Sequence, residues 1–218
     1  YQQETLPVEK RRGKGLKPVW QDLSAVLTHP HSRRYIIMSC VATGIILTFL
    51  SHAPLIYHNF GTSVGGFSVL FAVTSIGIVL GQIINHRLLA IMSSQRATVI
   101  AAVVVATTAI AIWVCAYTNN LSAYLFTALM FAFNMSYLII FSNLVSMTLE
   151  PHGARAGMAS AMFGFCSYIG GSVISAVLAF ITNQETLRWA FWFMLLSVLL
   201  LFGLLNILRL NRSESHPG

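Results

Sequence analysis

The side chain best suited to acid–base chemistry in the apolar parts of this sequence is His52, within the segment LTFLSHAPLIYHNF. An imidazole titrates near neutral pH, so His52 could bind a proton or hydrogen-bond a ligand. Pro54 follows it, and a proline inside a helix removes one backbone hydrogen bond, bends the helix and exposes a carbonyl one turn earlier. The alternative is an interfacial histidine that is only hydrated, because the apolar segment ends at Tyr57.

A second group of polar side chains lies among the rings of residues 121–147. Asn134, Tyr137 and Phe141 recur at intervals of three and four, so they share one face of a helix. Such a face suits the binding of varied amphipathic organic molecules, whereas hydrogen bonding between helices explains it equally well. The residues expected to line a substrate cavity are Ser51, His52, Tyr57, Asn134, Tyr137, Phe141 and Phe163.

No enzyme motif accompanies these residues. The sequence contains no P-loop, HExxH or GxGxxG pattern and no paired carboxylates in a loop. Its three cysteines, Cys40, Cys115 and Cys166, lie in apolar segments without CxxC spacing, which predicts buried apolar residues rather than metal ligands. We therefore expect neither an enzyme nor a metal or cofactor site, and no nucleotide domain for an ATP-driven pump.

The elements that must position these side chains are membrane helices. Hydrophobic residues make up 56% of the 218 residues and charged residues only 9%, against about 25% in soluble domains. The excess of 13 Lys and Arg over 6 Asp and Glu is therefore not read as nucleic-acid binding. A bilayer core needs roughly 20 apolar residues per helix. Six uncharged segments qualify, at about 35–57, 66–84, 97–116, 121–147, 157–182 and 190–208.

The basic residues predict the orientation, since cytoplasmic segments carry the excess of Lys and Arg. If the amino end is cytoplasmic, the outer loops hold only Arg188, and all other Lys and Arg residues lie inside. Both ends then face the cytoplasm, as in a bacterial inner-membrane protein with many spans. We divide the chain into a basic linker (1–34), a six-helix bundle (35–208) and a cytoplasmic tail (209–218).

Small residues predict where the helices pack closely, because lipid gives no hydrophobic drive for helix association. Gly77 and Gly81 stand in GxxxG spacing in the second segment. In the fifth segment Gly164 and Gly171 belong to rows of small residues at four-residue intervals. These rows indicate either static helix packing or a seam that moves during gating.

Three motifs together carry a resemblance to a known family. The first is ETLP at residues 4–7 followed by basic residues; the second is Ala-Pro, then Tyr57 and a Gly-Thr-Ser loop, at residues 53–63. The third is PHG at residues 151–153, leading into AGMASA. With these motifs the whole chain resembles the carboxyl-terminal half of a major facilitator superfamily drug exporter of the Bcr/CflA type. The superfamily's loop motif is degenerate here, with Gly81 and Arg87 present and Asn85 at the position of the acid.

The resemblance implies an all-α integral membrane protein that forms the six-helix half of a twelve-helix fold. Two such halves rock around a midplane site, and residues 3–15 look like the hinge that joins them. The resemblance also implies that the first, second, fourth and fifth helices line the cavity while the third and sixth face lipid. The acids that bind the coupled proton lie in the other half in this family.

The sequence therefore predicts half of a proton-coupled multidrug antiporter. Its expected partners are lipid, protons, a small amphipathic substrate and an amino-terminal six-helix half that this chain lacks, but no nucleic acid. One alternative is the same fold exporting a natural metabolite such as a nucleoside, sugar or amino acid. Another is a membrane assembly subunit that transports nothing.

Overall fold

The computed structural model describes residues 24–183 and 185–215, in which every regular element is helical. Six helices are long and apolar enough to cross a membrane, which confirms the predicted all-α membrane fold. They are α2 (Pro30–Asn59), α3 (Val64–Leu89), α4 (Ser94–Tyr117), α5 (Ala123–Leu149), α6 (Ala156–Thr182) and α7 (Thr186–Ser215). A 3-10 segment, η2 (Glu150–Arg155), joins α5 to α6, and residues 24–28 are also helical. The predicted linker lies outside the described residues over 1–23, and so does the tail over 216–218.

Serines and asparagines set the boundaries of these helices. The hydroxyls of Ser63, Ser93 and Ser122 cap α3, α4 and α5, each accepting a hydrogen bond from the backbone N–H three residues later. The turns at the other helix ends place Asn119 and Asn183 at φ of 55° and 47°, a left-handed conformation that asparagine tolerates better than most residues. The polar interruptions in the apolar pattern thus become tight turns.

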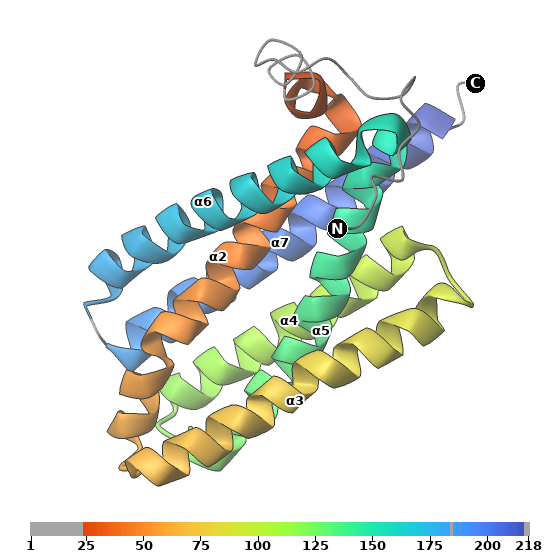
Figure 1. Cartoon of the computed structure of the whole chain (residues 1–218). Coiled ribbons are helices and arrows are strands. Elements are labelled where there is room, and N and C mark those ends of the chain that lie inside the picture. The colour runs from red at the N-terminus through yellow and green to blue at the C-terminus, as the bar shows by residue number, and fades with distance from the viewer. Residues whose placement is uncertain (1–23, 184, 216–218) are drawn as a thin grey trace, which may run out of the picture.

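The helices form two parallel pairs, α2 with α6 and α3 with α5, which lie side by side in Figure 1. Along the first pair Ser39 meets Ser167 and His52 meets Thr182. The numbers rise together, so the two helices run in the same direction. We call the end at which α2, α4 and α6 begin the basic end, because most arginines of the described residues lie there.

This pairing gives the bundle the symmetry of an inverted repeat. The first three helices, α2 to α4, begin with α2 at the basic end, whereas the second three, α5 to α7, repeat the same order beginning with α5 at the opposite end. The α2–α6 pair therefore corresponds to the α5–α3 pair, and α4 packs on its own equivalent, α7. The α2–α6 and α3–α5 contacts are therefore equivalent by symmetry, although different residues form them. The candidate site lies beside these two contacts.

The helices differ strongly in how much of their surface the bundle covers. In α2, 61% of the most apolar stretch is buried, against 17% in α3 and 22% in α6. In Figure 1 the last turns of α2 leave the line of the rest of the helix, as expected near Pro54. α2 is thus the central element, while α3 and α6 present broad open faces.

Candidate functional site

An aromatic wall forms where α2, α5 and α6 meet. We define it as Tyr137 and Phe141 of α5 with Phe163 of α6. The ring centroids of Tyr137 and Phe141 are 5.9 Å apart, and those of Phe141 and Phe163 are 5.4 Å apart. Thr43 of α2 lies beside the Tyr137 hydroxyl. Three of the seven predicted cavity residues therefore come together. Tyr137 and Phe141 are partly exposed and can stack with flat apolar or cationic molecules, whereas the buried Phe163 packs against Phe141.

Asn134 lies one turn before Tyr137 on the same side of α5, but its amide points to α3. Its Nδ2 donates a hydrogen bond of 3.1 Å to the carbonyl oxygen of Thr74 in α3, and the residue is buried. Its Oδ1 is buried without a hydrogen-bond partner among the described residues. The amide thus serves the contact between α3 and α5, which is the alternative that the sequence left open for this residue.

His52 is held at both ring nitrogens near the opposite end of α2. Its Nδ1 lies 2.9 Å from the carbonyl oxygen of Thr48, which can only accept, so Nδ1 carries the proton. The neutral ring then accepts at Nε2 from the hydroxyl of Thr182 in α6, 3.1 Å away. Trp189 of α7 donates to the same Thr48 oxygen at 3.3 Å. With 7% of its surface exposed, His52 joins three helices here and has no nitrogen left for a ligand.

Ser51, the neighbour of His52, faces outward into a groove between α2 and α6. The groove has a volume of about 540 Å³, and Ser172 and Ser175 of α6 line its other side. Leu50 also lines it, and the carbonyl of Leu50 lacks its helical donor because Pro54 has no N–H. An otherwise apolar groove thus contains several oxygen atoms that can accept hydrogen bonds.

Tyr57 ties α2 to α5 at the opposite end. Its hydroxyl lies 2.7 Å from the hydroxyl of Thr127, and its ring packs at 5.4 Å from Phe126 and 5.5 Å from Phe67. The side chain is fully buried. Tyr57 therefore stabilises the packing of α2 against α5 and is not open to a ligand in this conformation.

The predicted packing glycines divide into two kinds. Gly77 and Gly81 lie directly against the backbone carbonyls of Phe131 and Met135 in α5. Gly171 instead lies against the side chain of Thr43 and the backbone nitrogen of Gly44 in α2. Gly164 faces open space, with no atom within 4 Å of the place that a Cβ would occupy. The first three pack helices of this bundle together, whereas Gly164 does not.

Asn85 of the degenerate loop motif also forms a buried hydrogen bond inside the bundle. Its Oδ1 accepts a 3.0 Å hydrogen bond from Nδ2 of Asn143 in α5, and both residues are buried. Arg87 is exposed at the basic end. The amide at the position of the family's acid therefore fastens α3 to α5.

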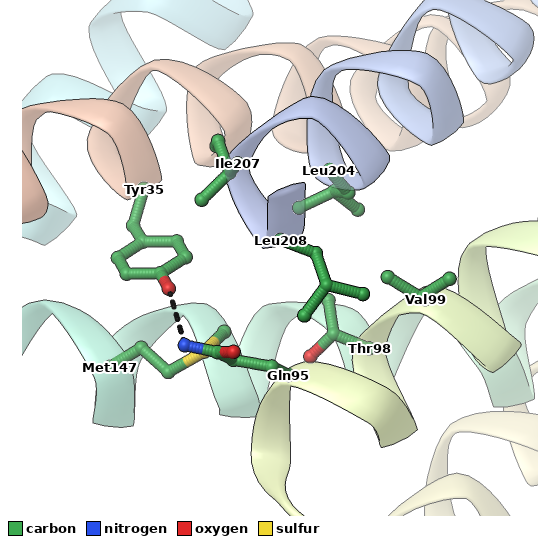
Figure 2. A pocket seen from close by; sticks show the side chains of 8 residues that line it. All are labelled: Tyr35, Gln95, Thr98, Val99, Met147, Leu204, Ile207 and Leu208. Carbon is green, nitrogen blue, oxygen red and sulfur yellow. Dashed lines mark hydrogen bonds between the residues drawn. The ribbon is translucent and has the colours of Figure 1, made fainter. Parts of the chain in front are cut away.

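Sequence reasoning missed a polar contact around Tyr35 at the basic end, of which Figure 2 shows the hydrogen bond between Tyr35 and Gln95. The Tyr35 hydroxyl accepts hydrogen bonds from Gln95 of α4 at 3.3 Å and from Asn211 of α7 at 2.9 Å. The cavity beside it holds about 10 Å³, room for about one water molecule. No spacing in the sequence could reveal this contact, because its members come from three separate helices. No three His, Cys, Asp or Glu side chains of the described part gather closely enough to hold a metal ion.

Comparison with known proteins gave two matches. Residues 3–175 match the family model of the Major Facilitator Superfamily. The "Uncharacterized MFS-type transporter YdgK" of Bacillus subtilis (strain 168) is 25% identical over 187 residues, which cover 84% of this chain and 45% of that protein. The chain thus spans about half the length of the curated relative that it matches. No solved structure matches it.

Proposed function

The chain belongs to the major facilitator superfamily, and we propose that it is the carboxyl-terminal half of a proton-coupled exporter of amphipathic drugs, of the Bcr/CflA type. The family makes it a membrane protein with several spans and a transporter rather than an enzyme. Drug efflux, proton coupling and a place in the bacterial inner membrane with the basic end in the cytoplasm belong to the proposal.

The observation that carries the half-transporter proposal is the open face of α6. We define this face as Gly157, Ala161, Gly164, Tyr168 and Ser172, at intervals of three and four residues. None of them is buried, and no atom lies within 4 Å of a Cβ built on either glycine. Rows of small residues let helices approach closely in membranes, and the two glycines of this row meet no other helix of the described bundle. A second set of helices, supplied by the other half, would cover it.

The aromatic wall supports a substrate with flat apolar groups. Tyr137, which stacks with Phe141, lies near Tyr168, which belongs to the open face of α6 and is 59% exposed. A substrate between the two halves could stack on these rings. No carboxylate lies within the six apolar segments, so the proposal assigns the coupling acid to the other half.

Co-expression tests this proposal. In a host deficient in drug efflux, this chain together with the amino-terminal half of a Bcr/CflA-type exporter should lower the accumulation of ethidium, and a protonophore should abolish the effect. The chain alone should have no effect. Tyr137→Ala should weaken efflux, whereas Phe202→Ala, at an exposed ring on α7, should not.

Two results would contradict it. Efflux by this chain without the second half would refute the half-transporter assignment. A lack of ethidium efflux, with both halves inserted in the membrane and bound to each other, would refute the drug-export assignment.

A further inference from the structure

Three histidines that the transport proposal does not use gather where α2 begins. His29 and His31 flank the first residue of α2, and His152 lies in η2, between α5 and α6. The ring centroids of His29 and His152 are 5.2 Å apart, and those of His29 and His31 are 6.5 Å apart. We propose that His29, His152 and Ser32 form a proton-sensitive clasp that holds η2 against the start of α2 and releases it when His152 is protonated.

Ser32 closes the clasp and defines the protonation state of His152. The Ser32 hydroxyl donates its only proton to the carbonyl oxygen of Thr148, 3.2 Å away. Its oxygen must therefore accept the hydrogen bond from Nε2 of His152, which lies 2.9 Å away. A neutral His152 with its proton on Nε2 meets this requirement, and its Nδ1 remains to take up a further proton. One hydroxyl thus connects α2, α5 and η2.

The closed clasp is a poor place for a charge on His152. This residue has only 8% of its surface exposed, so a charged ring there is poorly hydrated. The neighbouring Nδ1 of His29 is buried and has no hydrogen-bond partner among the described residues. His152 can therefore accept a further proton at low cost only by moving into water.

The charges around the clasp add to this effect. The charged groups that act on His152 are His29 from the start of α2 and Arg155 from η2, and both are cationic when protonated. His31 packs its ring at 4.9 Å from Tyr35, and Arg33 and Arg34 follow it in the first turn of α2. Glu150 of η2 acts on Tyr35 instead, and the first two turns of α6 contain no titratable residue. Protonation therefore brings like charges together, which favours an open clasp.

The position of the clasp gives its release a mechanical consequence. η2 joins α5, which carries Tyr137 and Phe141, to α6, which carries Phe163. Freeing η2 from α2 removes a restraint on how α5 and α6 move relative to each other at the basic end. Acidification on the side of the membrane that the basic end faces would thus loosen the packing of the aromatic wall. The clasp lies entirely within this chain, so it does not depend on the proposed function.

Cysteine reactivity in permeabilised membranes tests the clasp. After replacement of the three native cysteines, Thr148→Cys reports opening, because Thr148 is fully buried beneath the clasp. Ser146→Cys, exposed on the same helix, corrects for the effect of pH on the thiol itself. The ratio of their rates with a water-soluble methanethiosulfonate should rise about threefold or more from pH about 7.5 to about 5.5, the range in which an imidazole titrates.

Three histidine variants separate the clasp from other causes. His152→Gln still donates to Ser32 but cannot be charged, so the ratio should stay low at both pH values. His152→Ala should give a high ratio at both. His86→Gln, an exposed histidine in the last turn of α3, should keep the normal rise. A parent ratio that does not change with pH would overturn the proposal, and so would a rise that persists in His152→Gln. This comparison holds even if His152→Ala fails to fold, and no step requires transport.

Discussion

The α3–α5 and α2–α6 contacts are equivalent by the symmetry of the bundle, yet different groups close them. In the α3–α5 contact, Gly77 and Gly81 let the two backbones touch, and buried amides such as that of Asn143 hydrogen-bond across the contact. In the α2–α6 contact, side-chain hydroxyl, thiol and methyl groups make most of the close approaches, as between Ser39 and Ser167, and the backbone of Gly44 is approached at Gly171. Backbone contact fixes a register, whereas small side chains can exchange partners. We infer that α3–α5 is the fixed contact and α2–α6 the adaptable one.

The two contacts should differ most in the loss of unfolding free energy that follows when a methyl group is added at a glycine of each. In Gly81→Ala the new Cβ would overlap the backbone carbonyl of Met135, which cannot rotate away. We expect a loss of about 3 kcal/mol in the free energy of unfolding, the upper end of the range for overpacked cores. Denaturant unfolding of the purified protein in detergent measures it. Gly164→Ala is the matched control, since its Cβ meets open space.

The same methyl group on the α2–α6 contact should cost less. In Gly170→Ala the Cβ would lie 2.7 Å from Sγ and 2.8 Å from Cβ of Cys40; Sγ can rotate away, whereas relief at Cβ needs a small movement of α2. We expect a loss of about 2 kcal/mol, in the middle of the same range. The same unfolding measurement applies. Equal losses for Gly170→Ala and Gly81→Ala would remove the distinction between a fixed and an adaptable contact.

The smallest expected effect is that of the amide pair in the α3–α5 contact. A double-mutant cycle with Asn85→Ala and Asn143→Ala should give a coupling energy of about 0.6 kcal/mol, as found for hydrogen bonds between membrane helices. The pair Gln82 and Ser142, 3.1 Å apart in a more exposed part of the same contact, is the control and should couple less. A coupling energy near zero for Asn85 and Asn143 would show that glycine packing alone holds the contact.

The fold followed from local features of the sequence, whereas the site did so only in part. Apolar length and the Asn-containing turns gave six helices, because the cost of unpaired backbone in lipid is a property of each segment alone. The GxxxG spacing of Gly77 and Gly81 predicted close packing, but not that α5 was the partner. Helical periodicity placed Asn134 on the face of Tyr137 and Phe141, which the continuous helix α5 confirms. That its amide donates to α3 was not predictable, since the crossing of two helices decides which neighbour a side chain meets.

His52 and the histidine clasp also depend on contacts between helices that the sequence alone does not reveal. The type of residue identified His52 as able to titrate, but Thr48 and Thr182, which occupy its nitrogens, come from different turns and helices. The clasp joins residues separated by 120 positions, and only the fold brings Ser32 to His152. Chemistry that depends on contacts between helices is therefore visible only in the structure.

The exposed faces of α6 and α4 should differ in their access to water, and one measurement can test this. If a second half and a water-filled cavity adjoin α6, a cysteine at Gly164 should react with a water-soluble maleimide in intact membranes. A cysteine at Val103, exposed on α4 at a similar distance from the basic end, should stay unreactive in lipid. The account predicts a rapid reaction at position 164 and none at position 103. Equal protection at both positions would mean that α6 faces lipid as α4 does, and would contradict the half-transporter account.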